Sequence, residues 1–153
     1  TPVAGEASAA GAKLAATLLH HCARHTVPQP ETLVPPICVI WGGETTVSLG
    51  EGTSGVGGRC QELALAAART LSGWRSPVAL LAAGTDGRDG PTDAAGAIVD
   101  NHTWRLMEEA GRDPARDLAT HNAYPALESA GALLRTGLTE TNVMDVVIGV
   151  CVG

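Results

Sequence analysis

The sequence is poor in aromatic and basic residues. Its 153 residues include no Phe, one Tyr and three Trp, so a folded core has to be built from aliphatic side chains. Lys13 is the only lysine, and the net charge is −6. Because proteins that bind nucleic acid present a basic surface, we expect no nucleic-acid partner.

Long apolar segments and cysteine pairs are missing as well. No run of 18 apolar residues predicts a membrane span, and no secretory signal is visible. None of the four cysteines stands in a C-x-x-C pair or in a zinc pattern with the histidines. We expect reduced, mostly buried thiols and a cytoplasmic or mitochondrial location. The start at Thr1-Pro2 lacks Met, which suggests a piece of a longer protein.

What is present predicts one α/β domain with a mixed β-sheet flanked by helices. Hydrophobic residues make up 44% of the chain and charged residues 17%, which suits a packed core. Residue periodicity predicts helices at 6–25, 60–72, 103–110, 114–119 and 123–131, and strands at 37–41, 45–49, 78–83 and 143–152. The strand at 45–49 is expected to pair with the first as a hairpin. Residues 1–36 form a helix and a proline-rich connector, and residues 37–153 form the domain itself.

A glycine-rich loop, residues 50–58, precedes the helix predicted at 60–72. Such a loop exposes backbone N–H groups, and a helix N-terminus carries positive partial charge. Gly57 and Gly58 end the loop, and Arg59 adds a cation suited to phosphate or carboxylate. The alternative is that Arg59 forms a surface ion pair with Glu62 or Glu44.

A second loop, residues 84–93, carries three aspartates among three glycines and a proline. It follows a predicted buried strand, where open α/β sheets place ligands. The carboxylates of Asp86, Asp89 and Asp93 suit Mg²⁺, or one of them could accept a proton from an attacking hydroxyl. The alternative is a turn in which aspartates accept hydrogen bonds from backbone N–H groups.

Two further polar segments give weaker signals. Glu44 lies between two predicted strands and could contact a ligand or be exposed in a turn. Residues 136–145 contain Thr141 and Asn142, which could contact phosphate or simply form a polar turn before the last strand. Spacing alone favours the turn for this last segment.

Four motifs, taken in order, resemble the MOFRL domain of glycerate 2-kinases. They are WGGETTV at 41–47, GGRCQELAL at 57–65, AGTDGRDGPTDAAGAIVD at 83–100 and TNVMD at 141–145. The resemblance covers nearly all of the chain from residue 37 on, together with the preceding helix. Cys60 stands where that family usually has Asn.

The resemblance implies ATP-dependent phosphorylation of D-glycerate to 2-phosphoglycerate with Mg²⁺, a step of serine and glycerate metabolism. It places the site in a cleft shared with an N-terminal kinase domain in cis, which this chain does not contain. It implies catalytic roles for Arg59, Asp86 and Asp89, and Mg²⁺ binding by Asp86 and Asp93. The residues that it implies for substrate or phosphate binding are Gly57, Gly58, Glu44, Thr85, Thr141 and Asn142.

Two other functions stay open at this point. The chain could be a non-catalytic domain that binds an anion or a partner, or a Mg²⁺-dependent hydrolase that uses the same aspartates. An exposed apolar face would also allow a homodimer.

Overall fold

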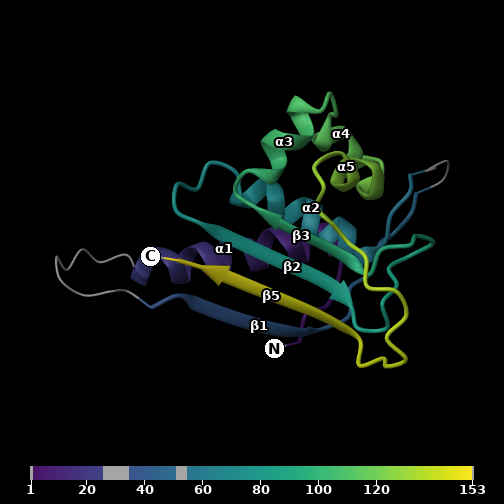
Figure 1. Ribbon diagram of the computed structural model, residues 1–153, viewed down its shortest axis with the longest axis horizontal. Helices are drawn as coiled ribbons and strands as arrows, with labels where there is room; N and C mark the ends of the chain where they lie inside the picture. Colours follow the sequence, from purple (N-terminus) through teal and green to yellow (C-terminus); the bar gives the residue numbers. More distant parts are fainter. Residues whose placement is uncertain (1, 26–34, 51–54, 153) are drawn as a thin grey trace.

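The computed structural model describes residues 2–25, 35–50 and 55–152, which form a layer of helices on one β-sheet (Figure 1). In chain order the elements are α1 (Ala7–His25), β1 (Ile37–Gly43), α2 (Arg59–Leu71), β2 (Val78–Gly84), β3 (Gly96–Asp100), α3 (Thr103–Glu109), α4 (Pro114–Ala119), α5 (Ala123–Ser129), β4 (Leu133–Leu134) and β5 (Asp145–Cys151). The α/β class and all five predicted helices are confirmed. Most of the predicted connector and the middle of the glycine loop lie outside the described residues.

The sheet has the strand order β1-β5-β2-β3-β4, and each of these neighbouring pairs is antiparallel. The expected mixture of parallel and antiparallel strands is therefore wrong for the strand pairs. Strands β1 and β2 do run in the same direction, with α2 between them in the chain, but β5 inserts between them in the sheet. The described parallel pairings are two isolated bridges, Val3 with Gly43 and Glu6 with Thr46.

The predicted hairpin strand at 45–49 is wrong. After β1 the backbone bonds instead to residues at the start of α1: the N–H of Thr46 donates to the carbonyl oxygen of Gly5 at 2.9 Å, and that of Ala7 donates to the carbonyl oxygen of Thr46 at 2.8 Å. Strands β3 and β4 were not predicted, because β3 has only five residues, of which the first two are Gly and Ala, and β4 has two residues.

The core lies between the sheet and the helices. Alternate residues of β2 and β5 point at the helices, and Leu80 and Val147 there are almost fully buried. From the helices come Leu18 of α1, Leu65 of α2, and further large side chains of α3 and α5. All of these side chains are aliphatic or Met, as the lack of Phe requires.

Gly11 explains how two helices cover the sheet side by side. It sits in the middle of α1, and a Cβ on it would collide with the backbone carbonyl of Leu63 in α2. The two helix backbones can approach this closely because residue 11 has no side chain.

We expect Gly11→Ala to destabilise the protein by about 2 kcal/mol or more, because overpacking at a backbone contact forces the helices apart. Helix propensity alone predicts the opposite sign, a gain of about 1 kcal/mol. Urea unfolding of the two proteins measures the difference, and Ala16→Gly on the exposed side of α1 is the propensity control. A more stable Gly11→Ala protein would show that the helices do not touch there.

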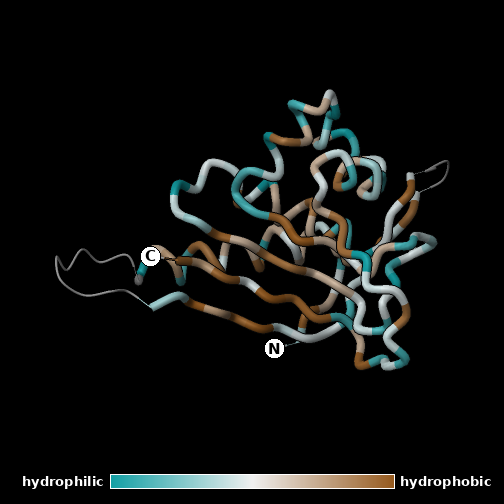
Figure 2. The backbone as a smooth tube through the Cα atoms, viewed as in Figure 1, coloured by the Kyte–Doolittle hydropathy of each residue, from teal (hydrophilic) through white to brown (hydrophobic). Residues whose placement is uncertain are grey.

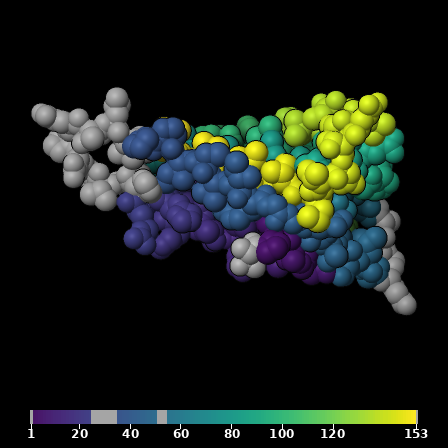
Figure 3. All heavy atoms as spheres, turned by 90° about the horizontal axis from the view of Figure 1, so that it is seen from below, coloured from purple at the N-terminus to yellow at the C-terminus, as the bar shows by residue number. Residues whose placement is uncertain are grey.

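The other face of the sheet is uncovered and apolar. Figure 2 shows hydrophobic residues along the strands, and Ile40, Ile98 and Val150 on this face are 67%, 46% and 36% exposed. In the space-filling view (Figure 3), β1 and the residues after it lie along the surface between α1 and the C-terminal segment. An antiparallel sheet with a solvated face normally alternates apolar and polar residues, and this one does not.

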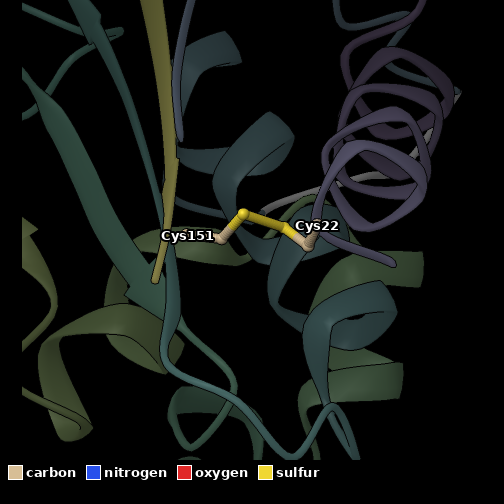
Figure 4. The surroundings of a disulfide bond; sticks show 2 residues. All are labelled: Cys22 and Cys151. Carbon is tan, nitrogen blue, oxygen red and sulfur yellow. A yellow bond between two sulfur atoms is a disulfide. The ribbon is translucent and has the colours of Figure 1, made fainter. Parts of the chain in front are cut away.

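A disulfide joins Cys22 at the end of α1 to Cys151 at the end of β5 (Figure 4). The prediction of four reduced thiols is therefore wrong for this pair. The two cysteines are 129 residues apart in sequence, so spacing gave no signal for them. Cys38 and Cys60 are free, and burial raises the pKa of the Cys60 thiol far above its usual range. Cys60 therefore remains a neutral thiol.

No helix within the described ranges is long and apolar enough to cross a membrane.

Candidate functional site

The candidate site lies at one edge of the sheet, where β1 and β2 end and β5 begins. In the strand register, Asp145 pairs with Gly43 on one side and with Gly84 on the other. The glycine loop leads into α2 at the same edge (Figure 1). The segments that carry Glu44, Arg59, Thr85 and Asp145 therefore meet here, although they are far apart in sequence.

Arg59, the first residue of α2, is held by two carboxylates. Its Nε and Nη2 donate to Oδ2 and Oδ1 of Asp145 at 2.7 and 2.8 Å, and Nη2 lies 3.3 Å from Oε1 of Glu44. The Asp145 hydrogen bonds raise the pKa of Arg59, so it stays charged. The predicted partner Glu44 is confirmed, and the predicted partner Glu62 is wrong. The guanidinium is half-buried and has a fixed orientation.

Arg59 opens onto a cavity of about 610 Å³. The residues of its wall include Glu44, Thr45, Gly57, Gly58, Glu62 and His121. No acceptor for the backbone N–H groups of Gly57 and Gly58 lies among the described residues. A fixed cation beside such N–H groups suits a carboxylate or phosphate ligand.

Gly58 is a glycine because of its neighbours within the protein. A Cβ on Gly58 would collide with the side chain and backbone of Asp89, and one on Gly90 would collide with the carbonyl oxygen of Gly57. The glycine loop and the aspartate loop are thus packed backbone to backbone.

Asp89 caps α2. Its Oδ1 accepts from the N–H of Cys60 at 3.0 Å and its Oδ2 from the N–H of Gln61 at 2.7 Å. The side chain is buried, which raises the pKa of Asp89 to about 6, while the two N–H groups act in the opposite direction. Both oxygens are used inside the protein, so this aspartate corresponds to the structural alternative weighed for the loop.

We expect Asp89→Ala to cost about 3 kcal/mol of stability, because two buried backbone N–H groups lose their acceptor. The folded-state pKa near 6 lies above the ordinary value of about 3.9. Folded Asp89 holds its proton more tightly than the unfolded chain does. The stability that this adds is complete below about pH 4 and is lost as the pH rises through about 6. The stability gap between the two proteins should therefore be larger at pH 4 than at pH 7.

Urea unfolding at both pH values measures this gap. Asp113→Ala is the matched control, because Asp113 caps the exposed start of α4 through the N–H of Arg116 and should cost only about 1 kcal/mol. Equal losses in the two variants would mean that Asp89 is not a buried cap.

Asp86 and Asp93 do not converge with Asp89 on one point. Asp86 Oδ1 accepts from the N–H of Arg88 at 3.0 Å, and Asp93 bonds to Arg135 and Tyr124 at 2.8 and 2.9 Å. The Arg135 bond lowers the pKa of Asp93. Across the described ranges no three His, Cys, Asp or Glu side chains gather in a way that could hold a metal. A Mg²⁺ site formed by all three carboxylates, which the sequence allowed, is therefore wrong for the described structure.

The remaining predicted residues tie the loops together. Thr85 Oγ1 donates to the carbonyl oxygen of Met144 at 2.7 Å and accepts from the N–H of Val143 at 2.8 Å. Asn142 Oδ1 accepts from the N–H of Met144 at 3.0 Å, and Thr141 is exposed. None of Thr85, Thr141 and Asn142 lines the cavity beside Arg59. Their predicted contacts with substrate stay predictions.

Four residues of the site were not predicted from sequence as site residues. Asp145 was visible as the last residue of the TNVMD motif, and Glu62 as part of the GGRCQELAL motif. Thr45 lies within the WGGETTV motif, but His121 lies outside every motif. Only the last had no sequence signal at all.

Comparison with known proteins places the chain in a family. The model of the MOFRL family matches residues 37–145. The chain belongs to the MOFRL family. The matched residues include Glu44, Arg59, the aspartate loop and Asp145, which are the segments that meet at the edge of the sheet.

The MOFRL chain is similar to longer proteins. It is 52% identical over 120 residues to the D-glycerate 2-kinase of Thermotoga maritima, covering 78% of this chain and 28% of that one. It is 48% identical over 116 residues to the glycerate 2-kinase of Pyrococcus horikoshii, covering 76% and 26%. A relative from Agrobacterium vitis, 45% identical over 111 residues, is named a putative hydroxypyruvate reductase; the match covers 72% of this chain and 25% of that one.

A solved structure shares the fold. The crystal structure of glycerate kinase from Thermotoga maritima matches with a TM-score of 0.86 at 43% identity, over 99% of this chain and 35% of that chain. This MOFRL chain therefore spans about a third or less of the length of these relatives.

Proposed function

We propose that this MOFRL chain is the C-terminal domain of a glycerate 2-kinase, which transfers the γ-phosphoryl group of ATP to the 2-hydroxyl of D-glycerate. The observation that carries the proposal is Arg59, which lines a cavity and is fixed by two hydrogen bonds to Asp145. A fixed arginine suits phosphoryl transfer, and the matching relatives with 52% and 48% identity are named D-glycerate 2-kinase and glycerate 2-kinase.

Arg59 would stabilise negative charge. Phosphoryl transfer depends on positioning and on preorganised cations near the moving phosphoryl group. Asp145 holds the guanidinium before any ligand binds, so little reorganisation is needed. The same cation could instead bind the carboxylate of glycerate, and both roles require its fixed orientation.

A preceding N-terminal domain would complete the site. The matched relatives are about three to four times longer than the region that they share with this chain, as coverages of 28% and 26% indicate. Lys13, the sole lysine, lines a separate hollow beside Trp41 and is not at the Arg59 cavity. The apolar open face of the sheet also supports a covering domain. We call the protein in which this chain follows such a domain the two-domain protein.

ATP would bring Mg²⁺ with it. Mg²⁺ commonly takes one or two carboxylates and completes its shell with phosphate oxygens and water. Asp86, with one oxygen bonded to a backbone N–H, is better suited to this than Asp93, which is paired with Arg135. Asp89 is a cap and is excluded from our proposal as a ligand. A cytoplasmic or mitochondrial location and a homodimer stay predictions.

The test is product formation by the two-domain protein. ADP release that depends on D-glycerate, with 2-phosphoglycerate identified by phosphorus NMR, would support the kinase. ATP hydrolysis without glycerate would favour the hydrolase. Oxidation of NADH that depends on hydroxypyruvate would assign the activity named for the Agrobacterium vitis relative. If none of these reactions takes place, the non-catalytic binding domain is favoured.

A further inference from the structure

A second polar pair lines the same cavity as Arg59. Glu62 in the first turn of α2 and His121 in the turn between α4 and α5 are joined by a contact of 2.8 Å between Oε2 and Nδ1. Glu62 is buried, His121 is partly buried, and both line the cavity. A carboxylate that accepts from Nδ1 fixes the imidazole ring and leaves Nε2 as its acceptor atom.

The backbone holds His121 in an uncommon conformation. Its φ is +54°, in the left-handed region that residues other than glycine rarely adopt. The next residue anchors the turn, because Asn122 Oδ1 accepts from the N–H of Val56 at 3.1 Å and its Nδ2 donates to Asp117 at 3.1 Å. Such strained positions persist where surrounding bonds fix them, and they are typical of functional sites.

Thr45 supplies an independent sign of a ligand. It lines the same cavity and is 3% exposed, and its hydroxyl has no hydrogen-bond partner among the described residues. Nε2 of His121 has no partner there either. Buried hydroxyl groups are normally satisfied, so a ligand with hydroxyl or carboxylate groups is expected at the wall that Thr45 and His121 line.

The aspartate loop offers no comparable proton acceptor at this cavity. Both oxygens of Asp89 accept backbone N–H groups of α2. Asp86 and Asp93 are not on the wall of the cavity that Arg59 and His121 share. Among the described residues of this wall, Glu44 is paired with Arg59 and Glu62 with His121, and the imidazole of His121 keeps one nitrogen, Nε2, without a partner.

We propose that His121 accepts the proton of the attacking substrate hydroxyl, that Glu62 positions it, and that Thr45 binds the same hydroxy acid. This inference rests on the proposed kinase function. In the step, the O–H bond of the 2-hydroxyl breaks and its proton passes to Nε2, while the oxygen forms a bond to the γ-phosphorus. The bond from that phosphorus to the bridging oxygen breaks, and ADP leaves with the electron pair.

The first test is kinetic and uses the two-domain protein. His121→Asn should lower kcat by about 10²- to 10⁴-fold, the usual contribution of a general base, with little change in KM for ATP. Asn tolerates the left-handed backbone, so the variant should fold. His102→Asn at an exposed histidine is the matched control and should keep the parent rate.

Two further variants separate catalysis from structure. His121→Gly relieves the backbone strain, which offsets part of the stability lost with the Glu62 contact, so the variant should fold and yet be slow, and added imidazole should restore part of its rate. Glu62→Gln should be slow in the parent background but should slow His121→Asn no further, because a positioning residue acts through His121. Full additivity of the two losses would contradict this pairing.

The outcomes distinguish this inference from the kinase proposal. An active two-domain protein whose His121→Asn variant keeps its kcat would overturn the inference alone. If the parent forms no ADP, binding of D-glycerate can still be followed by nitrogen NMR of labelled histidines during a titration. The signals missing in His121→Asn identify those of His121. A change in the chemical shift of His121 Nε2 would support the hydroxy-acid site and contradict the kinase proposal. No change would contradict both.

Discussion

Arg59→Ala should lower D-glycerate-dependent ADP formation by the two-domain protein by about 100-fold or more, the scale seen when one preorganised charge-stabilising group is lost. The guanidinium is already oriented by the bidentate contact with Asp145, so alanine removes a cation that needs no rearrangement to act. Steady-state rates from a coupled ADP assay measure the effect. Arg59→Lys should recover only part of the rate, because an ammonium cannot form the forked contact.

Loss of fold has to be separated from loss of the cation. Arg59→Ala leaves Asp145, which is 7% exposed, without its partner and should cost about 2 kcal/mol of stability. The double variant Arg59→Ala/Asp145→Asn should regain stability without regaining activity. Arg69→Ala, at the other end of α2, is the control and should keep the rate. A near-normal rate in Arg59→Ala would show that Arg59 serves only as an ion pair.

The largest expected effect is that the 153-residue chain alone shows no glycerate kinase turnover. Phosphoryl transfer needs cations at the phosphates and an oriented nucleophile in one closed site. This chain supplies Arg59, carboxylates and His121, but its one lysine lies away from the cavity. The assay is ADP formation with D-glycerate at high protein concentration, compared with the two-domain protein at equal concentration.

Inactivity of the chain tests the shared-site proposal only if the chain is folded. Circular dichroism and a cooperative thermal melt of the chain are therefore the control. Robust turnover by the chain alone would contradict the shared-site proposal. Inactivity of both proteins would instead contradict the kinase assignment.

Local patterns in the sequence predicted the helices well. The 3.6-residue period of Leu and Ala predicted α2 within one residue at each end, and Asp113-Pro114 predicted the start of α4. These features depend on interactions between neighbours in sequence, which is why they could be read there. Strand pairing depends on distant segments, and the prediction failed for residues 45–49 and for β3.

The candidate site shows the same division. Arg59 was predicted to bind an anion because a cation at a helix start is a local feature. Asp89 was predicted to act on substrate, yet it caps a helix 28 and 29 residues away. The sequence offered both roles for an aspartate in a glycine loop, and packing against Gly58 selected the cap.

The sequence by itself determined the class of fold, the helices, the aliphatic core and the membership of the motifs in one family. Tertiary structure alone decided which groups meet: Arg59 with Asp145, Glu62 with His121, and Cys22 with Cys151, at separations of 86, 59 and 129 residues. The physical reason is that helix periods and caps arise from contacts a few residues apart. Ion pairs, a positioned imidazole and a disulfide require that the fold first bring distant segments together.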